Sequence, residues 1–141
     1  VFLSTDYATQ VGTIYEAGAT INVLAVLGGV NDLVASQTAA QIETTIQSLA
    51  TTVDATGWQK FVLYQLPVCP PTSAERTALE AWIAANWATY ADYLVDLQQS
   101  SIGAGQGVWP AYYSDATHPN SLGYAVWAAY ELPTLRTALG I

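Results

Sequence analysis

The stretch TINVLAVLGGVND, residues 20–32, places an apolar run directly before a glycine-rich turn. From Ile21 to Leu27, every residue except Asn22 is apolar. A continuous apolar run of this length is typical of a strand that is covered on both faces in a parallel sheet. Two glycines end the run. The stretch therefore predicts a buried strand that leads into a tight turn carrying Asn31.

Two further segments have the composition of strands. One is WQKFVLYQLP, residues 58–67, which its terminal proline stops, and the other is ADYLVDL, residues 91–97.

Four segments between and around the strands predict helices by their apolar spacing and caps. They are residues 3–17, a run from a capping box at Thr38 to Gly57, a run from a second capping box at Thr72, and a run from about Ser121 that Pro133 should kink or end.

Strands that alternate with helices predict an α/β fold with a parallel sheet. Right-handed crossovers then place helices on both faces of that sheet. Ligands in such folds bind outside the carboxyl ends of the strands. Asn31 follows one strand end, and the segment after residues 91–97 leads to Asp115 and His118. We therefore expect these three residues to lie around one crevice.

The composition limits the classes of function. A chain of 141 residues has the size of one domain, and its 52% hydrophobic content can form a core. The net charge of −8 argues against a nucleic-acid partner, and no apolar run reaches membrane-spanning length. Few charges and many Thr, Ala, Tyr and Trp residues favour an extracellular, secreted protein or one on the surface of a virus particle. Cys69 is the single cysteine, so it is either a buried thiol or pairs outside these residues.

His118 is the only histidine, and imidazole is the side chain whose unperturbed pKa lies near neutrality. Asp115 stands three residues earlier, close enough along the chain to orient the ring. An acyl-transfer site also needs a nucleophile and donors for the developing oxyanion, and an amide such as that of Asn31 is one such donor. The same residues fit simpler roles: Asp115 or Asn120 as a helix cap with His118 in solvent, and Asn31 in turn formation. No metal-ligand spacing is present.

Two blocks together resemble the SGNH/GDSL hydrolase family: GVND at residues 29–32 and DATHPNSLGY at residues 115–124. The resemblance spans essentially the whole chain. It implies a flavodoxin-like three-layer α/β/α fold and ester hydrolysis without a cofactor. It also implies that His118 is the general base and acid, that Asp115 orients it, and that Asn31 donates to the oxyanion.

The family's Gly-Asp-Ser block, which holds the nucleophile, and its second block are both absent. None of the serines lies on a predicted strand-to-helix turn: Ser4, Ser36, Ser48, Ser73, Ser100, Ser101, Ser114 and Ser121. In the family's strand order, 2-1-3-4-5, the three predicted strands would be strands 3, 4 and 5. Residues 21–27 would then form an open, aggregation-prone edge. We therefore expect residues 1–141 to be the C-terminal part of a single SGNH-like domain, with two strands and the serine supplied by a preceding segment or a second chain.

Two functions follow from this interpretation. The first is a serine esterase that acts on carbohydrate O-acetyl esters or on small acyl or lipid esters. The second is a catalytically inactive scaffold of the same fold, which binds carbohydrate or serves as an assembly module of a secreted complex or virion. A scaffold has no reason to keep Asn31, Asp115 and His118 in this pattern, and the esterase is therefore favoured.

Overall fold

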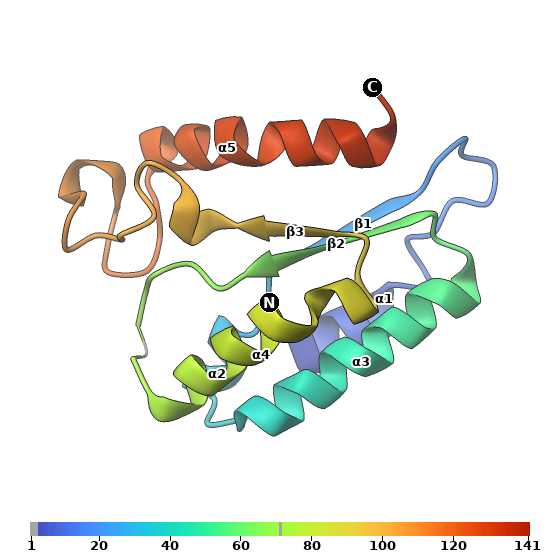
Figure 1. Ribbon diagram of the computed structural model, residues 1–141, viewed down its shortest axis with the longest axis horizontal. Coiled ribbons are helices and arrows are strands. Elements are labelled where there is room, and N and C mark those ends of the chain that lie inside the picture. Colours follow the sequence, from blue (N-terminus) through green and yellow to red (C-terminus); the bar gives the residue numbers. More distant parts are fainter. Residues whose placement is uncertain (1–2, 71) are drawn as a thin grey trace.

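The computed structural model describes residues 3–70 and 72–141, and its centre is a parallel three-stranded sheet (Figure 1). The strands are β1 (Val23–Val26), β2 (Lys60–Gln65) and β3 (Tyr93–Asp96), in the spatial order β1-β2-β3. Val23 is in register with Lys60, and Val62 with Tyr93. The α/β class, the positions of the strands and their parallel order are confirmed.

Helices cover both faces of the sheet (Figure 1). The helices α3 (Ala39–Thr56) and α4 (Ala74–Tyr90) lie on one face, and α5 (Ser121–Leu139) lies on the other. Alternate residues of β2 point to opposite sides, so Phe61 belongs to the core under α3 and α4, while Val62 belongs to the core under α5. This is a three-layer α/β/α arrangement.

One face of β1 departs from the prediction that this strand is covered on both sides. Leu24 and Val26 are buried in the core under α3 and α4, but Ala25 is exposed and Leu27 is 37% exposed. The reason is that α5 packs over β2 and β3. Within the described residues, β1 is also the outer strand, and nothing pairs with its far edge.

The first predicted helix is shorter than expected. A π-helical turn, η1 (Leu3–Tyr7), leads into α1 (Ala8–Gln10), and the helix predicted over residues 3–17 stops there. The Thr13 hydroxyl donates to the Gln10 carbonyl at 2.7 Å, a local bond that competes with helix continuation. The buried Asn22 closes the following loop, because its side chain bonds both the amide (3.1 Å) and the carbonyl (2.9 Å) of Glu16.

Both ends of α3 and the start of α5 match the sequence prediction, whereas the start of α4 differs. Thr38 forms a full capping box, and Gly57, at a φ of 93°, ends α3. The N-cap of α4 is Ser73 and not Thr72. Glu75, which the predicted capping box paired with Thr72, accepts the Ala39 amide of α3 at 2.6 Å.

The proline in α5 neither begins nor ends that helix, which continues past Pro133 to Leu139. A proline in a helix cannot donate to the carbonyl four residues earlier. That carbonyl belongs to Ala129, which is exposed, so water can satisfy it. Of the two effects predicted for Pro133, a kink or an end of the helix, the end is wrong and the kink stays a prediction.

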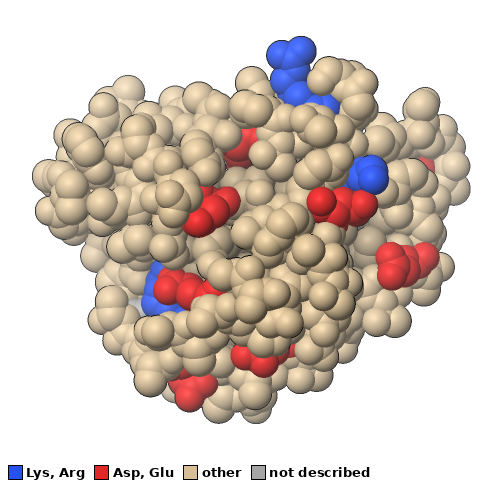
Figure 2. Space-filling view, in the orientation of Figure 1, with Lys and Arg blue, Asp and Glu red and all other residues tan. Residues whose placement is uncertain are grey.

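The surface carries few charges. Figure 2 shows acidic side chains scattered over one largely uncharged face of the molecule. Within the described ranges, no helix combines the length and apolar character that a membrane crossing requires.

The capping box gives a test of what begins α3. Thr38→Ala removes the acceptor of the Gln41 amide, and we expect the free energy of unfolding to fall by about 1 kcal/mol in urea denaturation. Thr38→Ser keeps the acceptor and should restore most of the loss. Thr44→Ala, a matched change within the same helix, should cost less than Thr38→Ala. Equal unfolding midpoints for Thr38→Ala and the unsubstituted chain would contradict the cap.

Candidate active site

A short loop between η3 (Pro110–Tyr112) and α5 holds His118. Tyr113 and Pro119 form an antiparallel bridge across this loop, and the Ser114 amide donates to the His118 carbonyl at 2.8 Å. The bridge closes residues 114–118 into a tight turn. The position of the His118 backbone is therefore set by the loop itself.

The Asp115 carboxylate organises the inside of this turn. It accepts the amides of Thr117 and His118, each at 2.7 Å. Its Oδ2 lies 2.9 Å from Nδ1 of the His118 ring, and its Oδ1 lies 3.1 Å from the same nitrogen. The hydrogen bond from the His118 side chain, followed by the two amides, lowers the pKa of Asp115 to about 2.

An ionised carboxylate accepts hydrogen bonds and cannot donate them. In the neutral ring, the proton of His118 therefore resides on Nδ1, and Nε2 is the nitrogen that can accept a proton from a reactant. Both side chains lie at the surface, with 67% of the His118 side chain and 57% of the Asp115 side chain exposed. The pair has the geometry of an oriented general base.

Asn120 has the capping role that the sequence left open. Its Oδ1 accepts the amides of Leu122 (3.0 Å) and Gly123 (3.2 Å) at the start of α5. Its Nδ2 donates to the Ala111 carbonyl at 2.8 Å, and its backbone amide donates to the Tyr112 carbonyl at 2.9 Å. Asn120 thus fixes the His118 loop to the first turn of α5.

Gly123 permits the close contact of this loop with α5. A Cβ at this position would lie 2.2 Å from the Tyr112 carbonyl oxygen and 2.7 Å from the Pro119 Cβ. No side chain fits there without moving backbone. The Pro-Asn-x-x-Gly pattern after His118 therefore has a structural reason.

Asn31 lies at the carboxyl end of β1, in the first turn of the short helix α2 (Val30–Val34). Gly29 turns the chain at a φ of 101°, in the left-handed region that glycine adopts easily. The neighbouring Asp32 is fully buried and accepts the Leu3 amide at 2.8 Å. The Asp32 carboxylate thus fixes the turn to η1, and Asn31 is exposed beside it.

The two loops meet around one cavity of about 330 Å³. Asn31 lines it from the turn after β1, and His118 lines it from the loop before α5. Of the three residues expected around one crevice, Asn31 and His118 line the cavity, whereas Asp115 contacts the His118 ring and is not among the lining residues. The catalytic role of each residue stays a prediction.

Several other residues that line this cavity received no role from the sequence. Pro67 and Cys69 follow β2, and Tyr124 and Trp127 come from α5, where their rings meet edge to face at 6.0 Å. The rule that ligands bind beyond the carboxyl ends of parallel strands pointed to the segment after β2. Nothing in the spacing of the aromatic residues of α5 singled them out.

The hydrogen bonds of the described side chains do not identify a nucleophile for His118. No serine hydroxyl described in the structure is hydrogen-bonded to the His118 ring, which instead contacts Asp115. The buried Cys69 thiol is close to Arg76, with Sγ 3.5 Å from Nη1. In the described part of the chain, no three His, Cys, Asp or Glu side chains are grouped so that they could hold a metal ion.

Replacing Gly123 tests the contact between the loop and α5. Gly123→Ala should lower the thermal midpoint and broaden the NMR signals of residues 113–119, because the added methyl forces the Tyr112 carbonyl away. Gly107→Ala is the matched control, since an added Cβ there meets no atom within 4 Å. Identical spectra for the two variants would show that the loop does not depend on this contact.

The Asp115 carboxyl should titrate well below its ordinary value of 3.8, at about 2, when its ¹³C signal is followed by NMR. Because folding lowers this pKa, the hydrogen bonds of Asp115 favour the closed loop above pH 3.8, and that contribution is lost as the pH falls through about 2. In His118→Ala the largest cause is removed, and the pKa should rise toward 3.8. An unchanged Asp115 titration in that variant would refute the ring contact.

Comparison with known proteins agrees with this geometry. No curated protein matches the chain significantly. The model of the GDSL-like Lipase/Acylhydrolase family matches residues 4–126, a span that includes the turn with Asn31 and the loop with Asp115 and His118. The chain therefore belongs to the GDSL-like lipase/acylhydrolase family.

Proposed function

We propose that this chain provides the base, its orienting acid and one oxyanion donor of a Ser-His-Asp ester hydrolase. The observation that supports this most directly is the Asp115–His118 contact of 2.9 Å beside a cavity that Asn31 also lines. Membership of an acylhydrolase family gives the general reaction class. The assignment of the three residues to their roles is our proposal.

In this mechanism, Nε2 of His118 takes the proton of a serine hydroxyl as its oxygen attacks the ester carbonyl. The carbonyl oxygen becomes negative in the tetrahedral intermediate, and the side-chain amide of Asn31 donates a hydrogen bond to it. His118 then gives the proton to the departing alcohol. Water repeats the sequence on the acyl-serine and releases the acid. Asp115 keeps the ring oriented and stabilises the imidazolium that forms twice in each cycle.

We propose that the serine comes from a segment outside residues 1–141, either on the same polypeptide or on a second chain. The 141 residues contain no Gly-Asp-Ser motif. In the described residues, the outer edge of β1 has unpaired backbone groups, and Ala25 beside it is exposed. A further strand on this edge would satisfy those groups and would enter the sheet next to the cavity.

The proposed substrates are neutral esters, either O-acetylated carbohydrates or small acyl or lipid esters. The cavity walls combine apolar side chains, such as Leu27 and Trp127, with the polar ends of Asn31 and His118. A net charge of −8 disfavours anionic substrates. We further propose an extracellular location, or one on the surface of a virus particle, on the basis of composition alone.

The alternative is an inactive scaffold that binds carbohydrate or a partner protein. It is favoured by one observation: among the described side chains, no serine hydroxyl is bonded to the His118 ring. It predicts saturable binding without ester turnover.

Activity of the full-length protein on p-nitrophenyl acetate distinguishes the two. We expect a serine-directed organophosphonate to abolish hydrolysis and to label a serine outside residues 1–141. His118→Ala should lower kcat by at least about 10³-fold, because the base is lost. Asn31→Ala should lower kcat by about 10²- to 10³-fold, because one oxyanion donor is lost.

Gln10→Ala, which removes an exposed side-chain amide at the end of α1, serves as the matched surface control and should keep full activity. Equal turnover by the unsubstituted protein and His118→Ala would refute the esterase, as would binding of acetylated sugar without any hydrolysis.

A further inference from the structure

The segment that follows β2 cannot hold itself in place by ordinary backbone pairing. Its sequence is LPVCP, residues 66–70, and the two prolines have no N–H to donate. Buried carbonyl groups nevertheless need donors. Pro67 and Cys69 are both buried, so the donors for their carbonyls must come from elsewhere in the fold.

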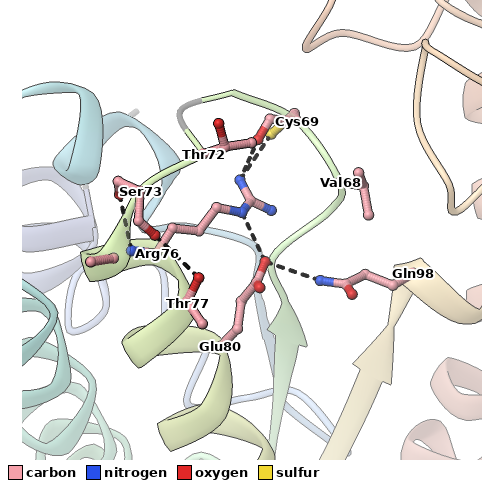
Figure 3. Close-up of a pocket in the computed structure, with 9 residues that line it drawn as sticks. Val68, Cys69, Thr72, Ser73, Arg76, Thr77, Glu80 and Gln98 are labelled. Carbon is pink, nitrogen blue, oxygen red and sulfur yellow. Dashed lines mark hydrogen bonds and ion pairs between the residues drawn. The ribbon is translucent and has the colours of Figure 1, made fainter.

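Those donors come from one buried guanidinium. Arg76, in the first turns of α4, is 5% exposed, and its side chain points back at the segment (Figure 3). Its Nη1 donates to the Cys69 carbonyl at 2.6 Å, and its Nη2 donates to the Pro67 carbonyl. A planar guanidinium presents its donors in a rigid fork that can bind two carbonyls at fixed positions, whereas the donors of an ammonium group rotate on a flexible stem.

Two further side chains complete the network (Figure 3). Glu80, one turn along α4, accepts from Nε of Arg76 at 2.8 Å, and this ion pair balances the buried positive charge. Gln98 donates from Nε2 to the same Glu80 oxygen at 3.1 Å and to the Leu66 carbonyl at 2.7 Å. The carbonyls of residues 66, 67 and 69 are thus all bound by side chains.

This segment is also a wall of the candidate active site. Pro67 and Cys69 line the cavity of Asn31 and His118, whereas Arg76 lines a second hollow, which shares Cys69 with that cavity. Arg76 therefore reaches the cavity only through the segment that it holds.

We propose that Arg76 is a positioning residue that fixes the Pro67–Cys69 wall of the His118 cavity and so sets the affinity for the ester. The proposal rests on the ester hydrolase described above. A wall that is already ordered need not be ordered when substrate binds, which favours binding. The wall contacts the substrate in the ground state and the transition state alike, so its loosening should act on KM and leave kcat nearly unchanged.

Cys69 makes the wall measurable without any activity. Cys69 is 5% exposed, and it lies on the segment that Arg76 holds. Alkylation by iodoacetamide, followed at Cys69 by peptide mass spectrometry on the folded full-length protein, therefore reports opening of the wall. We expect Arg76→Met to accelerate alkylation at least tenfold and Arg76→Lys to give an intermediate rate.

Three comparisons separate this role from general loss of stability. Val53→Ala weakens the core of α3 away from the wall. Each variant is alkylated at the same number of degrees below its own thermal midpoint. Arg136→Met makes the same substitution at an exposed arginine of α5. Both variants should alkylate Cys69 like the unsubstituted protein. For p-nitrophenyl acetate, Arg76→Met should raise KM about fivefold or more and change kcat less than twofold.

Two results would overturn the proposal. One is a Cys69 alkylation rate in Arg76→Met no faster than in Val53→Ala, and the other is a faster rate with an unchanged KM. If the unsubstituted full-length protein hydrolyses no ester, the proposed function fails and the claim about KM fails with it. Alkylation still decides in that case whether Arg76 holds the wall.

Discussion

The parallel pairing of β1, β2 and β3 is the constraint on which the candidate site depends. Parallel strands end at the same edge of a sheet, so the segments that leave them start side by side. The turn after β1 carries Asn31, the segment after β2 carries Pro67 and Cys69, and the chain that leaves β3 returns to α5 with His118. All these parts of the cavity come from one edge, although they are distant in the sequence.

Each of these segments is fixed by side chains that bind backbone. Asp32 holds the turn after β1 through the Leu3 amide. Arg76 holds the segment after β2 through two carbonyls. Asn120 holds the His118 loop through the Ala111 carbonyl and two amides of α5. Such bonds are needed because the segments lie beyond the ladder of the sheet, where no neighbouring strand supplies partners.

Local patterns were sufficient to predict much of the fold. The apolar run of β1, the capping box at Thr38 and the helix start near Ser121 depend on near neighbours in the chain, and all three are present in the structure. The placement of Asn31 and His118 at one cavity followed from parallel order alone.

Several of the failures involve contacts between distant segments. Glu75 caps α3 instead of completing a capping box for its own helix, and no local pattern contains that partner. The exposure of Ala25 depends on where α5 lies, which the sequence of β1 does not encode. The clamp of Arg76 on the segment after β2 likewise joins groups whose proximity appears only in three dimensions.

The two cores of the molecule share only the sheet, with β2 contributing to each from opposite faces. Separation of α5 from the sheet would therefore leave the layer of α3 and α4 largely intact, which is the condition for independent cooperative units. The turn of Asn31 belongs to the sheet and the loop of His118 leads into α5, so this separation would divide the two. A partial opening of this kind would separate His118 from Asn31 while most amide protons remained protected from exchange, so the cavity would be lost before the fold melted.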